Sequence, residues 1–477
     1  MKILIKKKKS FTKKDDLIVL NDKNSDLSQF KLTISEINFI KKSKKEITQI
    51  NQYSRQLFIV NYEKNINKNK QDESLRMLGH QLFKKASELT SIHIIDNHKN
   101  NNKNKNLTLK IAEGLALSSY QFLKHQTNPQ AFKLKTIYLC EKVERQDIIE
   151  LQNIINAVFF TRDLVNEPFS HLTAKDLANA SKNIGKKFNI KTKVFNKKKI
   201  ESLKMGGLLA VNKGSLDEPT FTIMEWKPKN AKNKKPIVFI GKGVVYDTGG
   251  LSLKPTANSM DLMKIDMGGA GTVIGAIQAI ASNKLPYYVI GLNPATDNRP
   301  SGNAYAPGDV ITMHSGKTVE VMNTDAEGRM LLADALSYAK KYDPKLVIDL
   351  ATLTGSAVAA IGSYGFVSMH KDAHDEHENL KKVGLKVHER LAEFPFWDDY
   401  DELIKSDIAD IKNLGGPYAG AITAGKFLSH FIDFPWIHID LSCVYSKSEY
   451  GYRGKGATGM GVRLLYEFIK NKTKNEN

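Results

Sequence analysis

The feature that most constrains the fold is a series of near-continuous apolar segments in the second half of the chain. They are KTKVFN (191–196), FTIMEWK (221–227), KPIVFIGKG (235–243), YYVIGLN (287–293) and KLVIDLATL (345–353). Between them lie AGTVIGAIQAIASN (270–283) and RMLLADALSYAKKY (329–342), in which apolar residues recur with helical spacing. Strands that are apolar on both faces and alternate with helices are typical of a mostly parallel sheet covered on both sides. These segments predict buried strands of a central sheet.

The first 155 residues show the same alternation with shorter segments. LIVL (17–20), LFIV (57–60), SIHIID (91–96) and LKTIYLC (134–140) predict strands, and residues 73–89 and 110–123 predict helices. A further helix over 147–168 should end before Pro168, because the residue before a proline disfavours the helical conformation. The sequence therefore predicts the α/β class with two domains: a smaller N-terminal α/β domain, 1–155, and a larger domain, 156–477, with a mostly parallel sheet flanked by helices.

The cysteine content and the N-terminal segment indicate in which cellular compartment the protein is expected. The chain has 477 residues, 41% of them hydrophobic, and only two cysteines, Cys140 and Cys443. There is no CxxC pair, and this usage suits a reducing compartment. The basic start MKILIKKKKSFTKK lacks the apolar run of a signal peptide, and LVIDLATLTGSAVAAIG carries Asp349 and several threonines. We therefore expect a soluble cytoplasmic protein that does not enter a membrane.

The net charge of +20 raises the possibility of a nucleic-acid partner. More than half of this excess lies in residues 1–150, much of it in the Lys/Asn-rich segments 61–71 and 97–106. Arginine is scarce there, and aromatic and basic residues are not interleaved as in RNA-recognition motifs. Compositional bias is the favoured reading. DNA binding through a basic surface stays open as an alternative.

Polar residues follow the strand PIVFI in the segment GKGVVYDTGGLSLKP (241–255). Reactive groups of parallel sheets gather at the carboxyl ends of strands, which is where this segment begins. Lys242 ends a buried strand, so it needs a partner or must be neutral, and a neutral amine can bind a metal. Asp247 and Lys254 follow within the same segment. The alternative is a glycine-rich loop with a surface lysine.

Two acidic segments precede apolar helices. Asp325 and Glu327 lie in NTDAEGRM (323–330) together with Arg329, and Asp266 lies in DMGGA (266–270). Capping of the following helix, or interaction with its dipole, explains such residues in most proteins, and Gly328 could simply make a turn. A functional role for these residues requires that, in the folded chain, both acidic segments lie close to the segment that carries Lys242.

Together the segments supply one nitrogen and four carboxylates as candidate metal ligands. They are Lys242, Asp247, Asp266, Asp325 and Glu327. Four carboxylates converging without compensation would repel one another, and two divalent cations would balance them, zinc or manganese being the first candidates. Paired ions suit hydrolysis. Lys254 and Arg329 remain as cationic catalytic residues that need not touch the metals.

The order and content of these segments resemble the leucyl aminopeptidase (cytosol aminopeptidase) family of dinuclear metallopeptidases. RDLVNEP (162–168), PSGNAYAPGDV (300–310) and DLATLTG (349–355) resemble it too. The resemblance runs from about residue 160 to about residue 465, and residues 1–150 carry no such signature. It implies that residues 156–477 are a catalytic domain that releases N-terminal amino acids from peptides with a free N-terminus. It also implies a homohexamer.

The resemblance implies a role for each candidate. The tighter metal site takes Lys242, Asp247, Asp266 and Glu327, and the exchangeable site takes Asp247, Asp325 and Glu327. A water molecule bridging the two ions would be the nucleophile. Arg329 would hold a bicarbonate ion as general base, and Lys254 would stabilise the tetrahedral intermediate.

Other catalytic classes lack their motifs. GxSxG, HExxH and the Walker loop are absent, so serine hydrolase, zincin and P-loop functions have no support. A catalytically silent scaffold is the remaining rival, and the presence of all candidate ligands argues against it. His438, in WIHIDL, is expected to be a core histidine, and Cys443 is expected to be buried.

Overall fold

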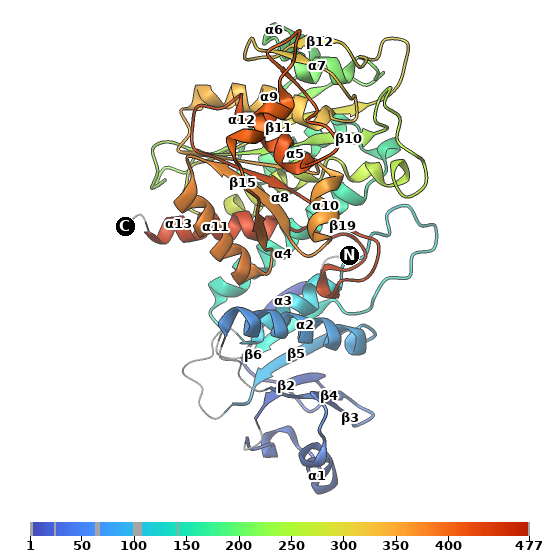
Figure 1. Cartoon of the computed structure of the whole chain (residues 1–477). Helices are drawn as coiled ribbons and strands as arrows, with labels where there is room; N and C mark the ends of the chain where they lie inside the picture. The colour runs from blue at the N-terminus through green and yellow to red at the C-terminus, as the bar shows by residue number, and fades with distance from the viewer. Residues whose placement is uncertain (1–2, 23–24, 63–66, 99–106, 141–142, 476–477) are drawn as a thin grey trace. The chain divides into compact units, whose positions relative to one another are not determined.

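A computed structural model describes residues 3–22, 25–62, 67–98, 107–140 and 143–475 (Figure 1). They form two compact units: Met1–Phe159 with Glu449–Gly454, and Phe160–Ser448 with Lys455–Asn477. No pattern in the sequence indicated that 449–454 belongs with the smaller unit. Parts of the Lys/Asn-rich segments, 63–66 and 99–106, lie outside the described residues. Across the described ranges, no helix is both long and apolar enough to cross a membrane.

The smaller unit is built on a six-stranded sheet in the order β1-β6-β5-β2-β4-β3. The strands are β1 (Leu4–Lys8), β2 (Leu17–Asn21), β3 (Ile47–Asn51), β4 (Gln56–Asn61), β5 (Ser91–Asp96) and β6 (Thr136–Cys140). Every neighbouring pair is parallel except β3 with β4. All five residues of β2 are buried, as expected for a central strand covered on both faces.

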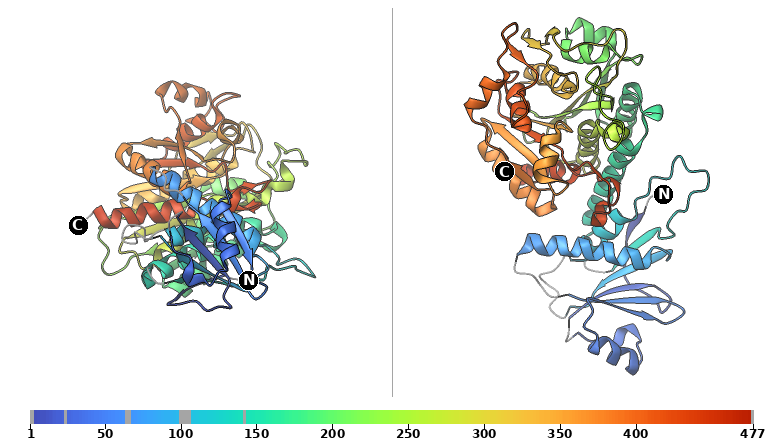
Figure 2. Two further views of the ribbon diagram at one scale, coloured as in Figure 1. Left: turned by 90° about the horizontal axis from the view of Figure 1, so that it is seen from below. Right: turned by 45° about the vertical axis from the view of Figure 1, so that its right-hand side comes forward.

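Helices lie on both faces of this sheet. α2 (Lys68–Ala86) and α3 (Leu107–Ser118) pack against each other on one side, and α1 (Ile34–Lys42) lies on the other (Figures 1 and 2). Ile40 of α1 packs in one cluster with Leu17 and Val19 of β2. The predicted strands are confirmed. The helix predicted over 110–123 is wrong at its end, because α3 ends at Ser118.

The larger unit contains a nine-stranded sheet in the order β16-β15-β18-β14-β9-β11-β8-β7, with β10 paired to β11. The strands predicted from apolar segments are β7 (Lys191–Phe195), β8 (Thr220–Trp226), β9 (Ile237–Gly241), β11 (Val289–Asn298) and β14 (Leu346–Ala351). The others are β10 (Gly243–Asp247), β15 (Phe366–Lys371), β16 (Leu391–Glu393) and β18 (Trp436–Asp440). The central run β18-β14-β9-β11 is parallel, and antiparallel pairs occur toward the edges. The mostly parallel sheet is confirmed.

One strand departs from the prediction. β7 was expected to be buried, but it is the edge strand of the sheet and none of its five residues is fully buried. Its lysines, Lys191 and Lys193, alternate with Thr192 and Val194, and an edge strand with lysines resists pairing with other chains.

Helices cover both faces of the larger sheet (Figure 1). α8 (Gly268–Ser282) packs on β9, β11 and β14, and it contacts α5 (Ala174–Phe188) and α13 (Val462–Asn475). On the other face lie α9 (Glu327–Ala339), α7 (Gly206–Asn212) and α12 (Gly420–Ser429). The two helices predicted at 270–283 and 329–342 are α8 and α9. α4 (Arg145–Asn166) ends before Pro168 as predicted.

The strand KPIVFIGKG divides at Lys242. β9 ends at Gly241, and β10 begins at Gly243 and pairs with β11. The Lys242 backbone N–H still donates to Leu350 of β14, and its carbonyl accepts from Ala270 of α8, at 3.0 and 2.9 Å. Lys242 is therefore fixed between two strands and a helix at the carboxyl end of the sheet.

Candidate metal centre

Lys242 lies at the centre of a buried group of charges. Its Nζ is 2.8 Å from Asp266 Oδ2 and 2.8 Å from Glu327 Oε1, and it donates to the Thr352 carbonyl at 2.8 Å. Only 2% of the residue is exposed. Burial alone would lower the pKa of Lys242, but the carboxylates of Asp266 and Glu327 outweigh it and raise that pKa above the usual value for lysine.

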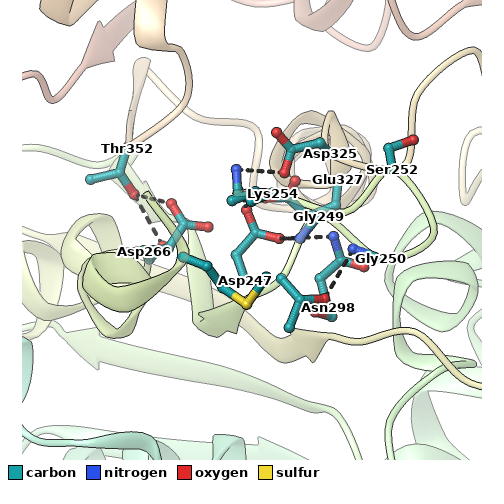
Figure 3. A network of polar contacts seen from close by, with 12 residues as sticks. Asp247, Gly249, Gly250, Ser252, Lys254, Asp266, Asn298, Asp325, Glu327 and Thr352 are labelled. Atoms are coloured by element: carbon teal, nitrogen blue, oxygen red, sulfur yellow. Dashed lines mark hydrogen bonds and ion pairs between the residues drawn. The ribbon is translucent and has the colours of Figure 1, made fainter. Parts of the chain in front are cut away.

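Asp266 is directed at Lys242 and not at the start of α8. Met267 is the N-cap residue of α8, and no side chain caps the helix there. Thr352, which follows β14, donates its hydroxyl to Asp266 Oδ1 at 2.7 Å (Figure 3). Burial raises the pKa of Asp266 well above its usual value, although Lys242 opposes this effect. The helix-capping explanation for Asp266 is therefore wrong.

Asp247 and Asp325 share a second lysine. Lys254 Nζ is 3.0 Å from Asp247 Oδ2 and 2.5 Å from Asp325 Oδ1 (Figure 3). Asp247 Oδ1 accepts from the Gly249 N–H at 2.8 Å and from Asn298 Nδ2 at 2.9 Å. Burial, together with the charge of Glu327, raises the pKa of Asp247 to about 7. Burial would lower the pKa of Lys254, but Asp247 and other carboxylates raise it above its usual value.

The two lysine-centred groups meet at Glu327. Asp247, Asp266 and Glu327 each offer an oxygen, and these oxygens lie within 4.8 Å of one another. Glu327 is the first residue of α9 and is 1% exposed. Burial would raise its pKa, but Lys242 and Lys254 lower it. The structure thus brings together all five candidate ligands and Lys254.

The glycines of these segments give the charged side chains room. Gly249 and Gly250 have φ of 86° and 63°, values that favour glycine. Gly328 lies inside α9, so it makes no turn, and that alternative is wrong. A Cβ at Gly328 would lie 2.5 Å from Lys242 Cε and 2.7 Å from Lys242 Nζ. The absence of a side chain at Gly328 therefore leaves the space that the Lys242 amine occupies.

Arg329 lies two residues after Glu327 and is buried, and its hydrogen bond goes to a backbone carbonyl and not to one of the candidate carboxylates. Its Nη1 donates to the Asn413 carbonyl at 2.7 Å, and within the described residues its Nε is buried with no hydrogen-bond partner. Burial lowers the pKa of Arg329 to about 10, against the opposing charges of Glu327 and Asp440. The guanidinium stays charged at neutral pH, so it can hold a small anion.

The donor set fits divalent cations. Burial and mutual repulsion raise the pKa of Asp247, Asp266 and Asp325, and cations relieve both effects. Carboxylate oxygens and a lysine nitrogen are hard to borderline donors, as manganese or zinc prefers. Lys242 can donate a lone pair only after losing its proton, so metal binding there releases a proton.

Sequence patterns missed the neighbours that orient these ligands. Thr352, Asn298 and Asn413 donate to or accept from candidate residues 51 to 86 positions away. Two of them had a signal in the sequence, since Asn298 ends β11 and Thr352 follows β14 within the segment DLATLTG. Elsewhere the predictions hold: His438 Nδ1 is fully buried 2.6 Å from Asp349 Oδ1, and Cys443 is buried.

Known proteins are similar to this chain in sequence and in fold. Residues 159–466 match the model of the cytosol aminopeptidase family, catalytic domain. A probable cytosol aminopeptidase of Chlorobaculum tepidum is 54% identical over 312 residues, which are 65% of this chain and 61% of that protein. The match therefore spans less than two thirds of that relative.

Solved structures are similar over nearly the whole chain. A mutant of tomato leucine aminopeptidase superposes with a TM-score of 0.85 at 27% identity, covering 98% of this chain and 97% of that one. A bottromycin maturation enzyme in complex with manganese gives 0.85 at 25% identity, covering 96% and 100%. The two-domain α/β architecture is thus shared with these structures.

Proposed function

The chain belongs to the cytosol aminopeptidase family, and on that premise we propose that it is a dinuclear-metal aminopeptidase. It would hydrolyse the N-terminal peptide bond of peptides and release N-terminal amino acids. One observation carries the proposal: Asp247, Asp266 and Glu327 converge within 4.8 Å around the buried amine of Lys242. Placing this much charge in a buried position is costly, and hydrolysis at a metal pair explains it.

We assign the ligands to two sites that share two carboxylates. The tighter site takes Lys242, Asp247, Asp266 and Glu327, and the exchangeable site takes Asp247, Asp325 and Glu327. The manganese complex of the bottromycin maturation enzyme supports manganese as one occupant, and zinc is the other candidate. When bound, two such ions would polarise the scissile carbonyl and lower the pKa of a water molecule.

Lys254 and Arg329 act as cations that are not ligands. Lys254 Nζ reaches both Asp247 and Asp325, and its raised pKa keeps it protonated. It can therefore stabilise the oxyanion of the tetrahedral intermediate. Arg329 cannot donate a lone pair, but its buried Nε can hold bicarbonate, which would accept a proton as general base.

Recognition of a free N-terminus tests the proposal. Restored with manganese or zinc, the protein should release leucine from a leucyl-anilide or a short peptide and should leave the N-acetylated substrate intact. Equal cleavage of the free and acetylated substrates, or activity that persists after complete metal removal, would contradict an aminopeptidase at this centre.

The remaining family expectations are part of the proposal. The names of the relatives support a cytoplasmic location, and the family implies a homohexamer. The DNA-binding alternative rests on charge alone, and neither the described residues nor the comparisons add support to it.

A further inference from the structure

A second group of side chains that could hold a metal ion lies in the larger unit, on elements that carry no ligand of the carboxylate centre. His370 is in β15, His377 is in α11 (His374–Val387), and Glu393 ends β16. One potential ligand atom from each lies within 4.8 Å of the other two. His370 Nε2 is 3.3 Å from Glu393 Oε1, and His377 Nδ1 is 3.8 Å from Glu393 Oε2. The group thus joins three elements at one edge of the sheet.

The hydrogen bonds of His377 leave one lone pair facing the other two side chains. The ring is fully buried, and its Nε2 is 2.9 Å from Ser368 Oγ. Ser368 in turn donates toward the Ala392 carbonyl at 3.5 Å, so its oxygen is left to accept from Nε2–H. A neutral imidazole carries a single N–H, and this hydrogen bond places it on Nε2. Nδ1 therefore presents a lone pair toward Glu393.

This arrangement leaves buried nitrogen atoms without hydrogen bonds. Among the described residues, neither His377 Nδ1 nor His370 Nδ1 has a hydrogen-bond partner. Orphaned buried nitrogens are costly, and a histidine whose other nitrogen donates to a neighbour is the usual arrangement of a metal ligand. The two rings are 4.8 Å apart between centroids, so one ion can reach both.

A cavity gives an ion access to the group. Its volume is about 760 Å³, and its lining includes His370, Glu393, Trp397, Lys426 and His430. His370 and Glu393 are partly exposed to it, with 20% and 36% of their side chains accessible. A bound ion would therefore have protein ligands on one side and solvent on the other.

We propose that His370, His377 and Glu393 bind a zinc ion that holds α11 against β15 and β16. Two imidazoles and one carboxylate are borderline donors, and a three-ligand site with a position left to solvent is common for zinc. The neighbouring Lys381 limits the affinity, because its Nζ is 2.8 Å from Glu393 Oε2 and is a competing cation. The site does not depend on the proposed aminopeptidase activity.

Zinc counting tests the site. The full chain and its variants are dialysed against buffered free zinc, and bound zinc is measured by mass spectrometry. His370→Ala and Glu393→Gln should each hold one ion fewer than the wild type. His430→Ala, a histidine of the same cavity that pairs with Asp401 at 3.2 Å, is the control and should lose none. The difference does not depend on how many ions the carboxylate centre holds.

Two further results decide between a metal site and an ion-pair network. Lys381→Met removes the competing cation and should tighten binding of the extra zinc severalfold. Crystals grown with zinc should show an anomalous peak at the zinc edge among the three side chains. Equal zinc content in the wild type, His370→Ala and Glu393→Gln, or no such peak, would overturn the proposal.

Discussion

Gly328→Ala should impair catalysis by displacing Lys242 and not by weakening the helix in which Gly328 lies. The new Cβ would lie 2.5 Å from Lys242 Cε and 2.7 Å from Lys242 Nζ, whereas carbon atoms in contact are about 3.5 Å apart. The end of Lys242 must therefore move by about 1 Å, away from Asp266 and Glu327. A misplacement of that size costs about 10²-fold in rate. Alanine is a better helix former than glycine by about 1 kcal/mol, so the helix itself is not weakened.

The assay measures turnover, bound metal and chemical unfolding of the same preparations. Gly328→Ala should lose about 10²-fold in turnover and bind metal more weakly. Its free energy of unfolding in the metal-free state should also fall, because the displaced amine weakens its buried ion pairs with Asp266 and Glu327. Gly271→Ala is the matched control, because it also lies in a helix and its Cβ meets nothing closer than 3.4 Å. Full turnover in Gly328→Ala would refute the role of Lys242 at the centre.

Four other outcomes are expected. Thr352→Val removes the hydroxyl donated to Asp266 and should weaken metal binding by about 10–100-fold in equilibrium dialysis. Lys254→Ala should keep its metals in elemental analysis and lose about 10²–10³ in turnover. Arg329→Ala should lose any stimulation by bicarbonate in bicarbonate-depleted buffer, and an unchanged response would exclude it. Asp334 is a buried residue of α9, and burial raises its pKa to about 7 against the opposing effect of backbone N–H donors. Between pH 4 and pH 7 the folded state therefore keeps Asp334 protonated, whereas the unfolded state has lost that proton. Stability should therefore fall across that range, by up to about 4 kcal/mol relative to Asp334→Asn in urea unfolding.

The central strands and helices could be predicted because burial on both faces leaves a strong local pattern. The apolar segments 237–241 and 346–351 are strands of the sheet core, where neither face needs polar residues. β7 carries Lys191 and Lys193 among its five residues, and its place at the edge depends on which strands pair, and pairing is not a local property. The attachment of 449–454 to the smaller unit is equally non-local.

The candidate site was predictable to the extent that its residues lie in short motifs. Lys242, Asp247, Asp266 and Glu327 converge because each lies at a strand end or a helix start on one edge of the sheet. Asn298 and its partner Asp247 are 51 residues apart, and no local pattern links them. Side chains that orient the ligands in this way can be identified only from the three-dimensional fold, which shows which strand ends lie together.

The stoichiometry of manganese tests the central claim most directly, because manganese prefers oxygen ligands and marks the carboxylate centre. The metal-free chain is titrated with Mn²⁺ while bound metal and leucine release are followed together. We predict two ions per chain with activity that appears as they bind, one tight ion in Asp325→Ala, and loss of both in Glu327→Ala. Two tightly bound ions in Glu327→Ala, or leucine release without any bound metal, would contradict the shared-carboxylate centre.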